Sequence, residues 1–405
     1  MRATRISRSS ARPIAGKAVV SATVLGLAVA VIPGAAVAAT SWAVVSTPNR
    51  GSLANTLYDV AATPSGAAWA VGSWYDTSRA APRTLAMRWT GSAWTAVTTP
   101  NVGPYYNELQ GADATSASDA WAVGYSRDSS SAPYNSLAMH YNGTAWTVTA
   151  TPQPGVTTRE LYDVEALSGS NAWAVGWYYD AGWAAETLIV HWNGATWSQV
   201  PSPSPGSAYN QLYGVGGSSA NDVWAVGTTV NAGEPRGSRH PLALHWNGSS
   251  WASVSIPNPP SGSAILRSVA AISPTDAWAV GSQSGYSTPV AYHWNGSVWS
   301  VVATPTVGTS GNNLFYRVAA LDAARVWAVG YRSGGSGPQP LVERWNGTSW
   351  TVEPTPALDL GGLTQGVATT TGPSGTPTVW VAGFRTSSVN GSFTDRTLTL
   401  RGTGS

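Results

Sequence analysis

Aromatic rings and polar side chains stand next to one another in the segments of this chain that vary from repeat to repeat. A ring face can cover the C–H groups of a sugar, while amide, carboxylate and guanidinium groups meet its hydroxyls. This combination indicates a surface that binds carbohydrate or cell-envelope material, although plain solvated loops would have a similar composition. The candidate ligand-binding residues are Trp74, Tyr75, Tyr106, Asn107, Arg159, Trp177, Tyr178, Trp183 and Asn210.

Carboxylates offer a second kind of chemistry, acid–base catalysis on a polymer. The plausible acids of a hydrolase or lyase are Glu108, Glu160, Asp59 and Asp163, but no pair of them belongs to a recognisable motif. His240 is the one histidine outside a repeated position, and it has no partner motif for nucleophilic catalysis. The sequence has no HExxH, no P-loop and no cluster of metal ligands. We therefore predict no catalytic residue, no metal site and no cofactor.

A repeat positions all of these residues. The phrase WAVG occurs at Trp69 and five further positions, and a degraded WVAG follows at Trp380, with spacings of 49 to 54 residues. Each unit runs through four short phrases such as LYDVAAT (57–63), AAWAVGSW (67–74), TLAMRWTG (84–91) and AWTAVTTP (93–100). All are rich in β-forming residues, and an Asn-Gly or Thr-Gly pair before the fourth phrase favours a tight hairpin. Four antiparallel strands in each unit of about 50 residues are typical of a propeller blade.

The two ends of the chain complement each other. The last segment, TLTLRGTGS (397–405), matches TLAMRWTGS (84–92) and stops where a fourth phrase should follow. That missing phrase is SWAVVSTP (41–48), near the other end of the chain. The sequence therefore predicts an all-β, seven-bladed β-propeller over residues 39–405, with four antiparallel strands per blade and a ring closed by an N-terminal strand that completes the last blade.

Most tryptophans and histidines occupy fixed places in the repeat. Of the 22 tryptophans, 19 recur in the WAVG phrase, at the start of the fourth phrase or before the turn, so we assign them to packing between blades. Trp74, Trp177 and Trp183 are the three that remain. A cationic residue recurs once per unit in the third phrase, and we expect it to stack on a tryptophan face. These positions are Arg88, His140, His191, His245, His293, Arg344 and Arg401.

Residues 1–38 have the pattern of a secretory signal, since a basic start precedes an apolar run and small residues near Ala38. A retained membrane anchor is the alternative. Cleavage would leave 16 Arg against 19 acids, a net charge of −3, so the scattered arginines give no basic patch for nucleic acid. We predict a secreted, extracellular protein that is monomeric, makes no contact with nucleic acid, and has no membrane contact after cleavage. Because it has no cysteine, its stability must come from packing.

The DAWAVG…HWNG…W repeats resemble those of a broad group of secreted actinobacterial β-propeller proteins, and more distantly the kelch and galactose-oxidase-like propellers. The resemblance covers nearly all of residues 40–405 and implies a secreted seven-bladed ring. The chain departs from kelch repeats because it lacks their Gly-Gly pair, and it lacks the Cys that a crosslinked copper site of the galactose-oxidase type needs. We expect a non-enzymatic binding module for glycan or cell-envelope material. A protein–protein interaction platform is the alternative, and a polysaccharide hydrolase or lyase is the third possibility.

Overall fold

The computed structural model describes residues 40–235, 237–283, 288–305, 307, 311–333, 337–372, 375–389 and 391–404. Over these ranges the chain forms 28 strands and no helix, so no helix there could cross a membrane. The predicted signal at residues 1–38 lies outside the described residues. The fold is thus all-β, as the alternating and β-branched phrases predict.

The strands follow one another in a repeating order of four roles. The first, innermost strands are β2 (Asn55–Ala62), β6 (Tyr106–Ser116), β10 (Arg159–Ser168), β14 (Tyr209–Ser219), β18 (Ala264–Ser273), β22 (Asn313–Asp322) and β26 (Gly362–Thr370). The second strands, which carry the WAVG phrase, are β3 (Ala68–Asp76), β7 (Asp119–Arg127), β11 (Asn171–Tyr179), β15 (Asp222–Val230), β19 (Asp276–Gln283), β23 (Arg325–Arg332) and β27 (Thr378–Val389).

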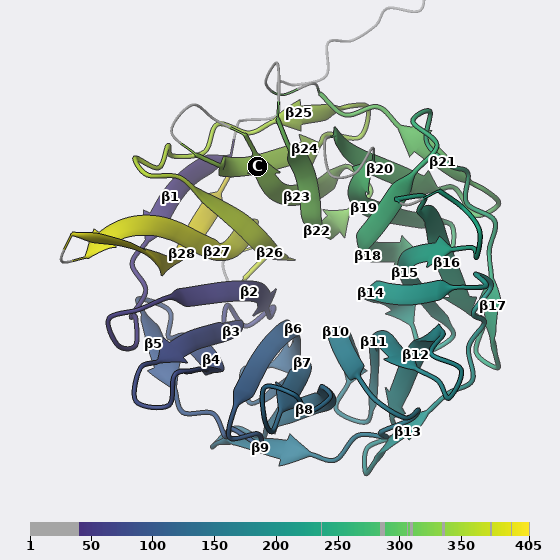
Figure 1. The fold of residues 1–405 in the computed structure, drawn as a ribbon. Helices are drawn as coiled ribbons and strands as arrows, with labels where there is room; N and C mark the ends of the chain where they lie inside the picture. The colour runs from purple at the N-terminus through teal and green to yellow at the C-terminus, as the bar shows by residue number, and fades with distance from the viewer. Residues whose placement is uncertain are drawn as a thin grey trace, which may run out of the picture. The chain divides into compact units, whose positions relative to one another are not determined.

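The third and fourth strands form the outer part of each group. The third strands are β4 (Ala81–Trp89), β8 (Asn135–Tyr141), β12 (Ala185–Trp192), β16 (His240–Trp246), β20 (Thr288–Trp294), β24 (Gln339–Trp345) and β28 (Ser392–Thr403). The fourth strands are β5 (Trp94–Val97), β9 (Trp146–Thr149), β13 (Trp197–Gln199), β17 (Trp251–Ser253), β21 (Trp299–Val302), β25 (Trp350–Val352) and β1 (Ser41–Val45). Figure 1 shows these groups side by side around a centre, with the first strands innermost.

Five of the sheets have four antiparallel strands, and one has eight. The eight-stranded sheet consists of β10–β13 and β14–β17, joined through a single parallel pair between Ala185 of β12 and Tyr209 of β14. Asn210 draws the two strands together, because its side-chain amide donates to the carbonyl of Ala185 at 3.2 Å. The repeat alone predicts separate sheets, so this bridge is a local addition to the pattern.

The first and last strands of the described chain share one sheet. β1 pairs antiparallel with β28 over five residues, from Ser41 opposite Thr403 to Val45 opposite Thr399. Trp42 packs against the cluster that contains Leu398 and Leu400, and its indole N–H donates to the Glu353 carboxylate at 3.2 Å. The complementarity between the two ends of the sequence is therefore matched by a direct contact between them.

Tryptophans join each group of strands to the next. Trp69 of β3 lies 5.2 Å, centroid to centroid, from Trp146 of β9, and the two rings meet edge to face. The same pairing recurs along the chain, and Trp380 of β27 meets Trp94 of β5 at 5.1 Å. All seven tryptophans of the WAVG position are buried. Since burial of one aromatic side chain stabilises by about 1.5–3 kcal/mol, these contacts are a large part of what holds the groups together.

The cationic position of the third strand stacks on tryptophan, as predicted. His140 lies 4.4 Å from Trp121, and Arg88 lies 5.5 Å from Trp69. A hydrogen bond also fixes the orientation of each histidine. The Asp or Asn before the WAVG phrase bonds a nitrogen of the imidazole ring, as Asp222 does for His245 at 2.7 Å. These side chains thus hold each histidine ring against its tryptophan.

Glu343 of β24 places a carboxyl group at a buried core position. Met87 and Met139 occupy the equivalent position in β4 and β8, whereas Glu343 has no exposed surface. Neither of its carboxylate oxygens has a hydrogen-bond partner within the described chain. Burial raises its pKa from an ordinary value near 4.5 to about 8.

We expect Trp42→Ala to lower the free energy of unfolding by about 2–4 kcal/mol, because it removes a large side chain from the contact between β1 and β28. Val44, which is on the same strand and 43% exposed, gives the matched control Val44→Ala. Chemical denaturation of both variants measures the difference. Equal losses in the two variants would contradict a structural role for the terminal contact.

We expect Glu343→Met to flatten the dependence of stability on pH. The folded protein holds this proton more tightly than the unfolded chain, so unfolding free energy falls as pH rises from about 4.5 to about 8. The substitution should therefore stabilise the protein at pH 8.5 by roughly 3–5 kcal/mol and change much less at pH 5. Urea denaturation at the two pH values measures this, and an unchanged pH slope would refute it.

Candidate functional site

A β-bulge interrupts every first strand at the same place. The pairing register with the second strand shifts between Leu57 and Asp59 in β2, and a matching shift occurs in β6, β10, β14, β18, β22 and β26. The extra residue at a bulge is left out of the strand ladder and its side chain is re-aimed. The seven bulged positions are Tyr58, Gln110, Tyr162, Tyr213, Arg267, Tyr316 and Gln365; we call them the bulge ring.

The glycine of the WAVG phrase makes room for the bulge. A Cβ atom on Gly72 would lie 2.0 Å from the carbonyl oxygen of Thr56, and the equivalent glycines of the other second strands show 1.8–2.1 Å. Contacts this short are impossible, so the first and second strands can approach only where the side chain is absent. The glycine of the repeated WAVG phrase therefore permits the bulge in the neighbouring first strand.

The bulge ring lines the first of two adjoining cavities, which together we call the channel. All seven of its side chains are half-buried, and together with Arg317 they line a cavity of about 170 Å³. Behind it, towards the ends of the first strands, lies a second cavity of about 300 Å³, lined by residues of the same seven strands. Arg317 borders both cavities.

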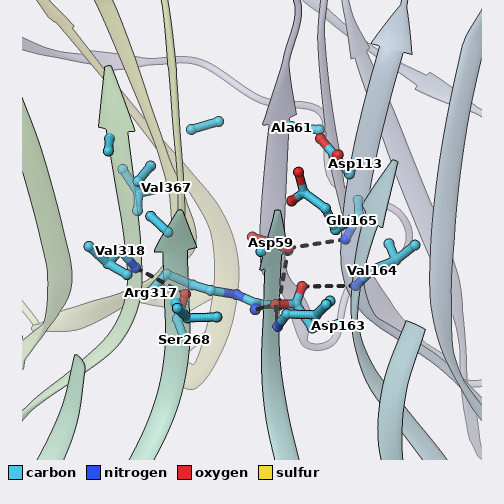
Figure 2. Close-up of a pocket in the computed structure, with 18 of the residues that line it drawn as sticks. Asp59, Ala61, Asp113, Asp163, Val164, Glu165, Ser268, Arg317, Val318 and Val367 are labelled. Carbon is cyan, nitrogen blue, oxygen red and sulfur yellow. Dashed lines mark hydrogen bonds and ion pairs between the residues drawn. The ribbon is translucent and has the colours of Figure 1, made fainter. Parts of the chain in front are cut away.

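Two carboxylates hold Arg317 across the second cavity. Its guanidinium lies 3.1 Å from an oxygen of Asp59 and 2.6 Å from one of Asp163, and Figure 2 shows the side chain extending between the strands. Burial raises the pKa of Asp59 to about 7 despite the opposing effect of Arg317. Burial also raises the pKa of Asp163. Two carboxylates against one guanidinium leave an excess negative charge, which burial disfavours.

The channel carboxylates also tie neighbouring first strands together. Asp59 accepts a hydrogen bond from the backbone N–H of Ala112 at 3.0 Å, and Asp163 accepts one from Val215 at 3.0 Å. Asp113 bonds Ala166 in the same way, and Figure 2 shows Asp113 and Glu165 close together in this cavity. Burial raises the pKa of Asp113 to about 6 and that of Glu165 well above its usual range. Within the described residues, no three His, Asp or Glu side chains are placed to hold a metal ion.

Glu108 and Glu160 accept hydrogen bonds from tyrosines of the bulge ring. The hydroxyl of Tyr58 donates to Glu108 at 3.2 Å, and that of Tyr162 donates to Glu160 at 2.5 Å. Burial raises the pKa of both carboxyls, and it raises the pKa of the Tyr58 and Tyr162 phenols well above their usual range. Phenols that hold their protons so firmly are poor general bases. All four acids considered for catalysis therefore already have protein partners.

Three of the candidate ligand-binding residues fix loops. Asn107 and Asn210 have no exposed surface, and their amides bond the backbone of the preceding loop at Gly103 and Gly206. Arg159 donates to the carbonyl of Pro154 at 2.9 Å and to the Asn135 side chain at 2.8 Å. Their amide and guanidinium groups are thus largely occupied within the protein.

The candidate aromatic residues fall into three places. Trp74 and Tyr75 are half-buried at the end of β3, and Tyr106 stacks on Tyr125 with ring centroids 6.0 Å apart. Trp177 is buried against Tyr179, whereas Trp183 is 67% exposed on a turn with a positive φ of 65°. Tyr178 is half-buried beside them on β11. Trp74 on β3 and Trp177 on β11 belong to different sheets, and the ligand role of this set remains a prediction.

Comparison with solved structures shows the fold. No protein-family model and no curated protein matches this sequence. A structure described as YCF48 bound to D1 peptide superposes with a TM-score of 0.51 at 15% identity, covering 89% of this chain and 94% of that one. An ulvan lyase bound to -[GlcA(1-4)Rha3S]- gives 0.50 at 9% identity, covering 86% and 94%. The chain is therefore similar to β-propeller proteins, and at these identities the likeness concerns the fold alone.

We expect Arg317→Met to lower the free energy of unfolding by about 3–5 kcal/mol at pH 7, because it leaves two buried carboxylates without their cationic partner. Adding Asp59→Asn and Asp163→Asn should recover most of that loss. Arg325→Met is the control, since its ion pair with Asp322 is partly exposed and contributes about 1 kcal/mol or less. Thermal and urea unfolding of the three proteins tests this. A triple variant no more stable than Arg317→Met would contradict the charge argument.

Proposed function

We propose that this protein is a secreted, non-enzymatic binding module for carbohydrate or cell-envelope polymer, built as a ring of seven blades. The observation that carries the proposal is the bulge ring, in which four tyrosines, two glutamines and one arginine converge on one cavity. Flat aromatic faces next to amide and guanidinium groups suit a polyhydroxylated ligand. The bulge ring lies near the start of the first strands, the end of each group where the predicted aromatic loops also lie.

The seven-bladed count follows from treating the eight-stranded sheet as two blades. Four strands per blade then use all 28, and β1 becomes the outer strand of the last blade. One bulge per first strand gives the cavity its seven contributors. The mature protein would act as an extracellular monomer, without nucleic-acid or membrane contact.

A protein–protein interaction platform remains the alternative, and the same face would then meet a peptide. A polysaccharide lyase or hydrolase is less well supported, because Glu108, Glu160, Asp59 and Asp163 are all engaged by protein groups and the adjacent phenols resist deprotonation.

We expect intrinsic fluorescence and calorimetry to detect binding to at least one member of a panel of soluble polysaccharides and peptidoglycan fragments. The double variant Tyr213→Ala/Tyr316→Ala should weaken that binding about tenfold or more, because it removes two aromatic rings that would be buried against the ligand. Phe393→Ala is the matched control, because Phe393 is an aromatic side chain 73% exposed outside the cavity. Trp183→Ala tests the loop residue in the same assay.

Three outcomes would redirect the proposal. Binding to no glycan, together with a defined partner in pull-downs, would favour the interaction platform. Product release over time from any bound polymer would establish an enzyme. Loss of binding in Phe393→Ala equal to that in the double variant would place the site elsewhere.

A further inference from the structure

The cavity of the bulge ring is cationic, although the second cavity behind it is acidic. Its lining residues within the described chain include two guanidinium groups, those of Arg267 and Arg317, and no carboxylate. Arg317 is engaged from the other side by Asp59 and Asp163. The two guanidinium groups together give this end of the channel its positive character.

Most hydrogen-bond donors of the bulge ring are already used. The hydroxyls of Tyr58, Tyr162 and Tyr213 donate to Glu108, Glu160 and Gln211. The amide nitrogen of Gln110 bonds both Glu108 at 3.0 Å and the Tyr125 hydroxyl at 3.2 Å, which accounts for its two hydrogens. These side chains can offer a ligand their ring faces and lone pairs, but few protons.

Arg267 is held in place by aromatic faces. Its guanidinium carbon lies 5.2 Å from the ring centroid of Tyr316 and 6.0 Å from that of Tyr213. A guanidinium that stacks on tyrosine keeps its N–H groups pointing outward in its own plane, where they can meet a carboxylate in a two-point contact. The best partner for this position is a planar anion.

Gln365 supplies the complementary feature. Gln365 lines the same cavity, and its side-chain oxygen is buried and accepts no hydrogen bond from the described part of the chain. A buried acceptor without a donor is unfavourable unless a ligand or water provides one. A sugar hydroxyl is such a donor, so the cavity has matched places for an anion and for a hydroxyl.

We propose that the bulge ring binds an acidic sugar, a uronic acid residue whose carboxylate meets Arg267 and whose hydroxyl meets Gln365. This inference rests on the proposed carbohydrate-binding function and names the class of sugar. The tyrosine faces next to Arg267 cover the sugar ring, and the carboxylate accepts hydrogen bonds from the Arg267 guanidinium.

The test uses two ligands with the same sugar backbone, an oligogalacturonide with free carboxylates and its uncharged, fully methyl-esterified form. We expect calorimetry with the mature protein to give at least tenfold tighter binding of the free acid at 50 mM salt. At 500 mM salt this preference should shrink, because ions screen the contact with Arg267. This arm needs no variant, so it stays decisive even if substitutions disturb folding.

Variants then assign the preference to its residue. Arg267→Gln should bring the affinities for the two ligands within about threefold of each other. Arg267→Lys should keep part of the preference, because lysine retains the positive charge but lacks the paired N–H donors of the guanidinium. Arg127→Gln is the matched control. Arg127 also stacks on a tyrosine, 4.6 Å from the Tyr134 ring, but it lies outside the cavity, so the preference should persist.

The outcomes separate this inference from the proposed function. Equal affinity for the acid and the ester, or for neutral glycans, would overturn the acidic-sugar assignment and leave carbohydrate binding in place. Binding to no glycan of the panel would overturn both. Preference for a peptide with a free C-terminal carboxylate over every sugar acid would also overturn it, as would a preference that survives in Arg267→Gln.

Discussion

The approach of each first strand to a glycine on its neighbour is the constraint on which the channel depends. The backbone comes so close that no side chain fits at Gly72 or its equivalents, and the strand gains one unpaired residue there. That residue leaves the regular alternation and joins the bulge ring. A motif that is nearly invariant along this chain therefore presents a position that varies freely, as Tyr, Gln or Arg.

The buried charges of the channel have a structural explanation. First strands of adjacent groups do not pair with each other, so their backbone N–H groups need other acceptors. Asp59, Asp113 and Asp163 supply them, and Ser268 accepts from Val318 in the same manner. Arg317 then offsets part of the accumulated negative charge. Acids that could be mistaken for a catalytic set thus act as links between the groups of strands.

The sequence predicts most of the architecture because the repeat is strict. The four phrases per unit, the packing role of the tryptophans, the stacked cationic position and the meeting of β1 with β28 all follow from counting and aligning. The bridge between β12 and β14 does not, because it depends on one asparagine amide.

The candidate site is harder to predict, for a physical reason. Setting aside the repeated phrases also sets aside Tyr58 and its equivalents, since they lie inside a repeated phrase. Period-two alternation gives no sign of an inserted residue, and only the glycine opposite hints at one. Asn107 and Asn210 show the converse difficulty. A polar residue in a variable segment looks available to a ligand, yet a buried amide that holds its own loop has the same sequence signature.

The contact between β1 and β28 has a consequence for the order of assembly. Thr47 and Thr397, 350 positions apart, bond each other through their side chains, so this junction waits for synthesis of the final strand. Until β28 has been synthesised, β1 lacks its partner strand, and its free edge can pair with a second molecule. Closing so long a loop adds only roughly 2 kcal/mol over a loop of one repeat, because the entropic penalty grows logarithmically. The risk of mispairing therefore depends on the time before β28 is made rather than on the equilibrium stability of the junction.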